Sequence, residues 1–240
     1  MRQLLVADLG LQPYAEALAF QREVARARIA GDVEDDVLLL VEHPPVVTLG
    51  RSAKSAHLLA SPTYLRQQGV EVFEVERGGD VTFHGPGQLV GYPIIDLKQH
   101  RRDLHWYLRQ VEQLLIDAMA TCGLRCGRNP PYTGVWIDDR KIASIGVHAR
   151  DWVTWHGFAL NVATDLRFFD LIVPCGIQSV RMTSLHAELP DERPSLRDVG
   201  ERVVGAAAQL FDLTPRTVTG REIAVALHNS TTAAAERVSR

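Results

Sequence analysis

The spacing of apolar and polar residues predicts strands and one helix in the first third of the chain. Residues 36–42 (DVLLLVE) form a continuous apolar run, which is typical of a strand covered on both faces. Residues 70–76 (VEVFEVE) alternate apolar and acidic side chains, which predicts a half-exposed strand. A short strand is expected at residues 4–7. Pro13 suits the first turn of a helix that runs to about Ile29, because its missing N–H costs nothing there.

Two longer helices and a buried strand are predicted further along the chain. Residues 89–97 have the apolar content of a buried strand. Asp103 is placed to cap a helix over residues 104–122, in which apolar side chains recur at helical spacing. Ser195 follows a proline and is placed to cap a second helix that reaches Phe211.

The remaining strands decide the fold class. Residues 134–149 (GVWIDDRKIASIGVHA) predict two strands around a polar turn, and residues 152–162 predict a third strand of the same meander. Strands and helices do not alternate regularly, which favours an α+β protein with mixed or antiparallel sheets flanked by helices. We expect one catalytic domain over residues 1–213 and a C-terminal extension without a chemical motif over residues 214–240.

Composition narrows the class of protein. The chain has 240 residues, of which 46% are hydrophobic and 23% charged, as in an ordinary globular domain. A net charge of −3 argues against binding to nucleic acid through a general excess of Lys and Arg. No signal-peptide pattern and no apolar run of membrane-spanning length is present. We therefore expect a cytoplasmic protein that binds neither nucleic acid nor membrane.

The three cysteines include one candidate nucleophile. Their odd number and the lack of a CxxC pair argue against disulfides and zinc sites. Cys122 falls on the apolar stripe of the predicted helix and Cys126 just beyond it, so both are interpreted as packing residues. Cys175 lies between Pro174 and Gly176, which predicts a loop position where the following N–H groups could stabilise an oxyanion. The alternative for Cys175 is an inert buried thiol.

Two glycine-containing stretches could lie against a ligand. Residues 77–88 (RGGDVTFHGPGQ) follow a predicted strand, and glycine permits both positive φ and close backbone approach. The alternative is a tight structural turn; neither the Walker nor the Rossmann pattern is present. Gly157, in residues 155–162 (WHGFALNV), marks a bulge or clears space beside a cleft, unless this is simply a core strand. The nearby His148 and His156 have no metal-ligand spacing.

Lys141 is the candidate activating group. If residues 141–147 form a strand, Lys141 shares one face with Ala143, Ile145 and Val147, which places an ammonium at the head of an apolar row. The alternative is an exposed lysine at the hairpin turn. Lys141 becomes functionally interesting only if it has a partner.

Together these stretches resemble the octanoyltransferases, the lipoyl(octanoyl) transferases of lipoate biosynthesis. The resemblance rests on RGGDVTFHGPGQLVGYP, GVWIDDRKIASIGVHA, HGFALNV and PCGI, which occur in the family's order and spacing, and it covers the chain to about Leu213. It implies a fold like that of the biotin and lipoate protein ligases. It also implies an acyltransferase that moves an octanoyl group from acyl carrier protein to a lysine of lipoyl domains, through a cysteine thioester.

The resemblance also assigns roles to residues. The family's nucleophile maps onto Cys175, and its lysine that lowers the pKa of the nucleophile maps onto Lys141. Many members carry Gln where this chain has Asp80. The family's substrate contacts map onto Arg77, Gly78, Gly79, Asp80, Val81, Thr82, Phe83, His84, Ser144, Ile145, Gly146, Gly157, Phe158 and Ala159.

The chemistry suits these residue types. A thioester donor is already activated, so we expect no cofactor, no ATP and no metal. A thiolate is favoured when an ammonium lies within ~4–6 Å of it. Gly78 and Gly79 are expected to leave a narrow channel open for the acyl chain and the acceptor lysine.

The resemblance also implies the partners. The donor is octanoyl-acyl carrier protein, the acceptors are apo lipoyl domains of E2 subunits and glycine cleavage H protein, and the enzyme is expected to be a monomer. Because the carrier is acidic, we expect a local basic rim. Three alternatives stay open: an ATP-dependent lipoate or biotin ligase, a non-catalytic binding module that keeps the groove, and a cysteine thioesterase. Candidates for the rim are Arg51, Lys54, Arg140 and Arg150.

Overall fold

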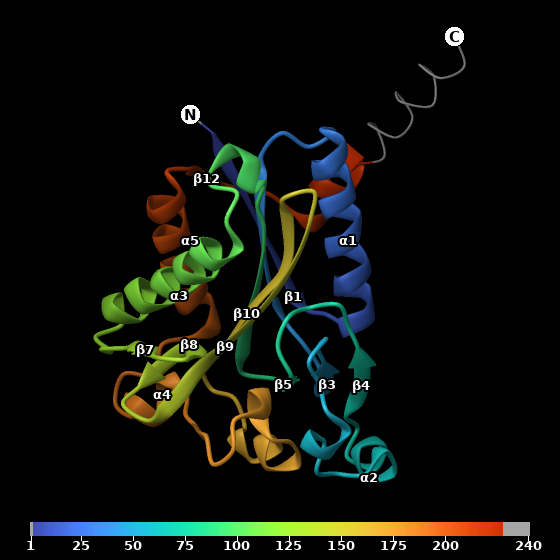
Figure 1. Ribbon diagram of the computed structural model, residues 1–240. Helices are drawn as coiled ribbons and strands as arrows, with labels where there is room; N and C mark the ends of the chain where they lie inside the picture. The colour runs from blue at the N-terminus through green and yellow to red at the C-terminus, as the bar shows by residue number, and fades with distance from the viewer. Residues whose placement is uncertain (1, 228–240) are drawn as a thin grey trace.

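The computed structural model describes residues 2–227, which form a large mixed sheet and a smaller sheet beside it (Figure 1). Pairs β12–β1, β1–β2 and β11–β9 are parallel, and the other pairs of the large sheet are antiparallel. The predicted α+β class is therefore confirmed. In spatial order the large sheet contains β12 (Thr214–Thr217), β1 (Gln3–Leu11), β2 (Asp36–Glu42), β6 (Gln88–Ile94), β10 (Val153–Asn161), β9 (Arg140–Arg150), β8 (Tyr132–Ile137) and β7 (Gly127–Asn129), and β11 (Arg181–Met182) pairs with β9.

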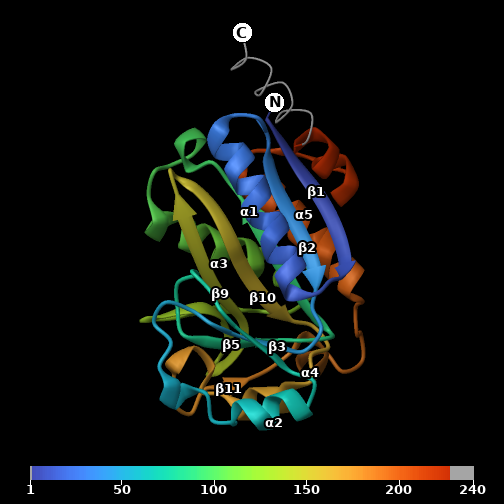
Figure 2. The same ribbon diagram turned by 90° about the vertical axis from the view of Figure 1, so that its right-hand side faces the viewer.

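Helices cover both faces of the large sheet (Figures 1 and 2). Helix α1 (Tyr14–Ala30) packs on β6 and β10, whereas α3 (Leu104–Thr121) and α5 (Leu196–Phe211) pack on the opposite face. A separate hydrophobic core lies under each layer, which explains why β2 and β6 are buried along almost their whole length. The apolar run predicted for residues 36–42 forms this two-sided strand.

Side chains cap the two helices on the α3–α5 face as predicted. The Asp103 carboxylate accepts a hydrogen bond from the N–H of Trp106 (3.0 Å), and α3 follows it directly. Ser195 and Asp198 form a reciprocal capping box at the start of α5. On the other face, α1 begins after Pro13 and ends at Gly31, whose φ of +83° requires a residue that tolerates the left-handed region.

The smaller sheet carries the glycine-rich stretch. Its strand order is β4 (Glu71–Glu74), β3 (Val46–Leu49), β5 (Val81–His84), and residues 75–80 connect β4 to β5. Phe83 stacks on Phe168 with ring centroids 4.7 Å apart, inside a core of its own. The short helices around this sheet and the large one are η1 (Ser55–His57), α2 (Pro62–Gln67), η2 (Leu97–Gln99), η3 (Leu166–Leu171), η4 (Pro174–Gly176) and α4 (Leu185–Glu188).

The segment after Leu213 contributes to the large sheet. Residues 214–217, which the sequence analysis assigns to a C-terminal extension, form edge strand β12 and pair in parallel with β1. The rest of that extension from residue 228 onward lies outside the described residues. Across residues 2–227, no helix combines the length and apolar character needed to cross a bilayer.

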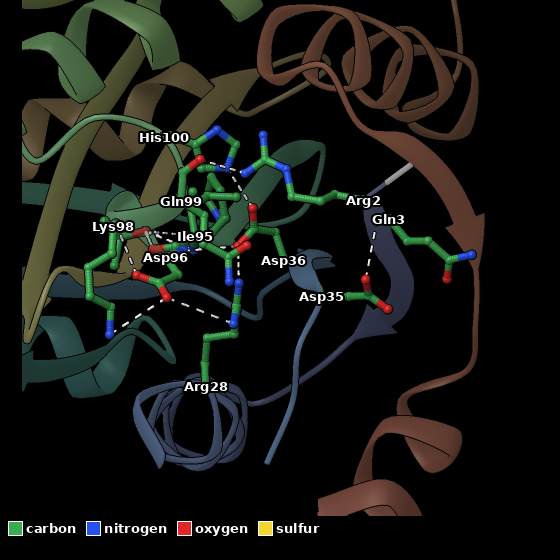
Figure 3. Close-up of polar contacts among 12 residues, drawn as sticks. Arg2, Gln3, Arg28, Asp35, Asp36, Ile95, Asp96, Lys98, Gln99 and His100 are labelled. Carbon is green, nitrogen blue, oxygen red and sulfur yellow. Dashed lines mark hydrogen bonds and ion pairs between the residues drawn. The ribbon is translucent and has the colours of Figure 1, made fainter. Parts of the chain in front are cut away.

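A buried ionic cluster joins α1 to the start of β2 (Figure 3). Asp36, at the start of β2, accepts hydrogen bonds from Arg28 of α1 (3.1 Å), His100 Nε2 (2.7 Å) and the backbone N–H of Asp96 (2.9 Å). Arg28 and Asp36 are 3% and 2% exposed, so both charges are removed from water and depend on each other.

Removing this carboxylate should destabilise the fold. We expect Asp36→Ala to lower the free energy of unfolding by about 3 kcal/mol or more, because Arg28 would stay buried without its closest counter-charge. This corresponds to a fall in Tm of roughly 6–12 °C in thermal unfolding. The matched control is Asp35→Ala, since Asp35 is only half-buried and accepts one long hydrogen bond, from the Gln3 N–H (3.3 Å). Equal losses in the two variants would contradict this account.

Candidate active site

A cavity of about 310 Å³ lies where β9 and β10 of the large sheet meet β5 and η4. Three residues of the predicted contact set do not line it: Gly78, Val81 and Phe83. Val81 and Phe83 instead pack in the core of the smaller sheet. From the predicted set, the cavity brings together Cys175, Lys141, Arg77, Gly79, Asp80, Thr82, His84, Ser144, Ile145, Gly146, Gly157, Phe158 and Ala159.

Strand pairing aligns two of the predicted segments. In the β9–β10 ladder, residues 144–146 lie directly opposite residues 157–159, with Gly146 paired to Gly157. A Cβ at Gly146 would lie 2.7 Å from the carbonyl oxygen of Gly78. Gly78 donates its own N–H to Val147 of β9 (2.8 Å), so the glycine-rich loop docks on this strand. The channel role expected for Gly78 is therefore wrong, whereas Gly79 does line the cavity, with a φ of +85°.

Cys175 and Lys141 are in direct contact. Lys141 Nζ lies 3.2 Å from Cys175 Sγ, and Ser144 Oγ lies 3.6 Å from the same sulfur. Lys141 is fully buried, which excludes the alternative of an exposed lysine at a hairpin turn. The ammonium also lies over the ring of Trp136, 5.3 Å from its centroid, in a cation–π contact, so the sulfur is its closest polar contact.

A shift in strand register aims Lys141 at the sulfur. Val135 of β8 pairs with Ala143, but the next residue, Trp136, pairs with Lys141, so β9 has one extra residue there. Strict alternation would have placed Lys141 on the face of Ala143, as the sequence analysis expected, and that prediction is wrong. The extra residue moves Lys141 to the face of Ser144, and both side chains reach Cys175.

The backbone at Cys175 is also unusual. Its φ is +56°, in the left-handed region that non-glycine residues rarely adopt and that costs on the order of 1 kcal/mol. The N–H groups of Gly176 and Ile177 donate to the carbonyls of Val173 (3.0 Å) and Pro174 (3.1 Å). These N–H groups are therefore already used within the turn, and the oxyanion role expected for them is not supported.

The charges around Cys175 favour its thiolate. Burial raises the pKa of this thiol. The Lys141 ammonium, the Ser144 hydroxyl and the Arg77 guanidinium together lower it by more than burial raises it, so the pKa lies below the ordinary value. The other two cysteines differ, because burial raises the pKa of Cys122 and raises that of Cys126 to about 12. Among the three thiols, Cys175 alone has a lowered pKa, which is the property expected of a nucleophile.

Arg77 supplies a second buried positive charge. Its guanidinium donates to Thr48 Oγ1 (2.9 Å) and to the Thr48 carbonyl (2.6 Å), and the residue is 7% exposed. Within the part of the chain that the structure describes, no carboxylate forms an ion pair with it. Arg77 is thus hydrogen-bonded by neutral groups, and its charge acts across the cavity on Cys175 and Asp80.

Several cavity residues were missed by the sequence analysis. Tyr14 of α1 and Tyr92 of β6 line the end of the cavity near His84. Burial raises the pKa of Tyr14 to about 12 and lowers that of His84 to about 3, so both side chains are neutral at physiological pH. No local motif marks these tyrosines, since only long-range packing brings them to the glycine-rich stretch. No group of three or more His, Cys, Asp or Glu in residues 2–227 is placed to hold a metal ion.

The expected basic rim is only partly present. Arg51 and Lys54 are exposed in the loop that covers the glycine-rich stretch, and the Arg51 N–H donates to the Arg77 carbonyl (3.0 Å). Arg140 is instead paired with Glu188 (2.8 Å). Arg150 lies at the opposite end of β9 from Lys141, roughly 30 Å away along the strand.

The chain matches known proteins along most of its length. Residues 13–208 match the family model of the lipoyl protein ligase A/B catalytic domain. An octanoyltransferase from Solibacter usitatus (strain Ellin6076) is 50% identical over 212 residues, which cover 88% of this chain and 94% of that protein.

Solved structures show the same fold at low sequence identity. Lipoate-protein ligase A bound with ATP has a TM-score of 0.75 at 17% identity, covering 96% of this chain and 94% of that one. A bipartite lipoate protein ligase from Thermoplasma acidophilum, studied with its E2 lipoyl domain, has a TM-score of 0.71 at 16% identity, covering 96% and 92%. The expected ligase-like fold is confirmed. Together the sequence and family matches show that the chain belongs to the lipoyl protein ligase A/B catalytic domain family and, within it, to the octanoyltransferases, which are acyltransferases.

Proposed function

We propose that this enzyme transfers an octanoyl group from octanoyl-acyl carrier protein to a lysine of lipoyl domains, through a thioester on Cys175. The observation that carries this proposal is the 3.2 Å contact between the Lys141 ammonium and the Cys175 sulfur. A buried ion pair of this kind holds a thiolate ready to attack an activated acyl donor.

The first half-reaction follows from this pair. The Cys175 thiolate attacks the donor's thioester carbonyl, and the carbon–sulfur bond to the carrier breaks. The departing carrier thiolate takes a proton from Lys141, which leaves the carrier as a thiol and Lys141 as a neutral amine. Since the donor thioester supplies the activation, this step uses neither ATP nor a metal.

The cavity suits a short acyl chain. Its volume of about 310 Å³ lies at the lower end of the range for ligand pockets. Apolar groups from Val90, Ile145, Phe158 and Ala159 line part of it. Each buried methylene contributes about 0.8 kcal/mol, so chain lengths that differ by one carbon should differ in affinity by roughly fourfold.

We place donor docking at the loop that carries Arg51 and Lys54. Both side chains are exposed beside the glycine-rich stretch, and an acidic carrier protein would be attracted to them.

Intact-mass spectrometry tests the proposal directly. Incubation with octanoyl-acyl carrier protein, without ATP, should add one octanoyl group to the enzyme, and peptide mapping should locate it on Cys175. Adding an apo lipoyl domain should remove the adduct and increase the mass of the acceptor by the same amount. Product formation only from free octanoate with ATP would indicate a ligase, and release of octanoate in the presence of acceptor would indicate a thioesterase.

A further inference from the structure

A carboxylate–imidazole pair lies against the loop of the nucleophile. His57 Nδ1 and Asp80 Oδ2 are 2.7 Å apart, and their side chains are 18% and 10% exposed. Asp80 lines the cavity, and His57 ends the short helix η1. The family resemblance maps substrate contact onto Asp80 but assigns nothing to His57.

The pair contacts the backbone on both sides of Cys175. A Cβ built on Gly176 would lie 2.7 Å from Asp80 Oδ2 and 3.1 Å from His57 Cε1, so only glycine fits there. The carbonyl of His57 accepts a hydrogen bond from the N–H of Val173, two residues before the cysteine (2.8 Å). The imidazole therefore packs against Gly176, the residue that follows the nucleophile, while of the pair only Asp80 lines the cavity itself.

The hydrogen bonds of Asp80 fix the tautomer of His57. Asp80 Oδ1 accepts from the backbone N–H of Val81 (2.8 Å), which leaves Oδ2 for the imidazole. Because an ionised carboxylate can only accept, Nδ1 carries the proton, and Nε2 of the neutral ring has a free lone pair. A carboxylate that orients an imidazole in this way is the usual arrangement of a general base.

The second half-reaction needs such a base. This inference rests on the proposed function, in which Lys141 is neutral once Cys175 is acylated. The acceptor lysine enters as an ammonium with three protons on nitrogen, and the amide product keeps one. As the nitrogen–carbon bond forms and the carbon–sulfur bond breaks, Cys175 leaves as a thiolate, so two protons require acceptors. Lys141 takes one of them and returns to the ammonium that pairs with the thiolate.

We propose that His57, oriented by Asp80, accepts the other proton at Nε2 and releases it to solvent. Its partial exposure provides a route to water, which the fully buried Lys141 lacks. His57 and Lys141 thus divide the two proton transfers of amide formation between them.

Single-turnover kinetics of His57→Asn test the proposal. The asparagine amide can still donate to Asp80 but cannot accept a proton at the position of Nε2. We expect octanoylation of Cys175 by the carrier at the wild-type rate, and transfer from the preloaded enzyme to an apo lipoyl domain about 10²-fold slower. His105→Asn, on the exposed side of α3, is the matched control and should leave both rates unchanged.

Two outcomes would overturn the proposal. One is transfer by the variant at the wild-type rate; the other is an equal loss in acylation and transfer, which would indicate a structural role. If His57→Asn fails to fold, His57→Gln replaces it in the same assay. The wild-type adduct, measured in parallel, separates this result from a failure of the proposed function.

Asp80→Asn tests the positioning role of the carboxylate. This variant keeps an oxygen for Nδ1 and removes the charge, so we expect the maximal transfer rate to fall about tenfold, with the acceptor KM unchanged. A raised acceptor KM with an unchanged maximal rate would instead make Asp80 a substrate contact and would refute its role in positioning His57.

Discussion

Cys175→Ala should abolish the octanoyl adduct and lower octanoyl transfer by about 10³-fold or more, on the scale of losses seen when an enzyme loses its nucleophile. Cys175 is the cysteine whose pKa is lowered by neighbouring charges, and its sulfur contacts both Lys141 and Ser144. No other group in the cavity can replace a thiolate at this position. Transfer is measured as the mass gain of the apo lipoyl domain under saturating donor.

The other two cysteines serve as internal controls. Cys122 and Cys126 remain in the variant, but burial raises the pKa of both, so neither should accept the acyl group at neutral pH. A stable adduct on either thiol in Cys175→Ala, together with retained transfer, would contradict the assignment of the nucleophile. Binding of the donor should be largely unaffected, because the substitution leaves the cavity walls in place.

Local patterns account for the predictions that hold. The apolar spacing over residues 104–122 and the capping residue Asp103 predict helix α3, and both patterns can be read from neighbouring residues of the sequence. The strand over residues 36–42 is predictable because a strand buried on both faces is apolar along almost its whole length. The candidate nucleophile and lysine were likewise recognised from short stretches, and the fold brings them into contact.

Long-range pairing accounts for the predictions that fail. The face of Lys141 depends on a register shift between β8 and β9, and the sequence of β9 alone does not encode it. Strand β12 (TPRT) is exposed at every position and contains a proline, so it has no apolar pattern to recognise. His57 and Asp80 are 23 residues apart in the sequence, and only the folding of the smaller sheet brings them together, so no local pattern predicts the pair.

Lys141→Met should raise the pKa of Cys175 and lower octanoyl transfer by about 10²–10³-fold. Methionine has a similar length and volume, and it suits the contact with Trp136. Burial, which raises the pKa of the thiol, stays in the variant, whereas the ammonium that lowers it is lost. Since a thiol ionises above its pKa, the thiolate fraction at neutral pH must fall.

The rate of alkylation by iodoacetamide against pH measures this change, because only the thiolate reacts. In the wild type the rate should reach its plateau at a lower pH than in Lys141→Met, and Cys175→Ala gives the background from the two remaining thiols. Arg77 and Ser144 still face the sulfur in the variant, so part of the activation should persist. If the two pH profiles coincide, then Arg77 and Ser144 alone hold the thiolate, and Lys141 must act only in the proton transfers: it protonates the departing carrier thiolate and then, as a neutral amine, accepts a proton from the incoming lysine.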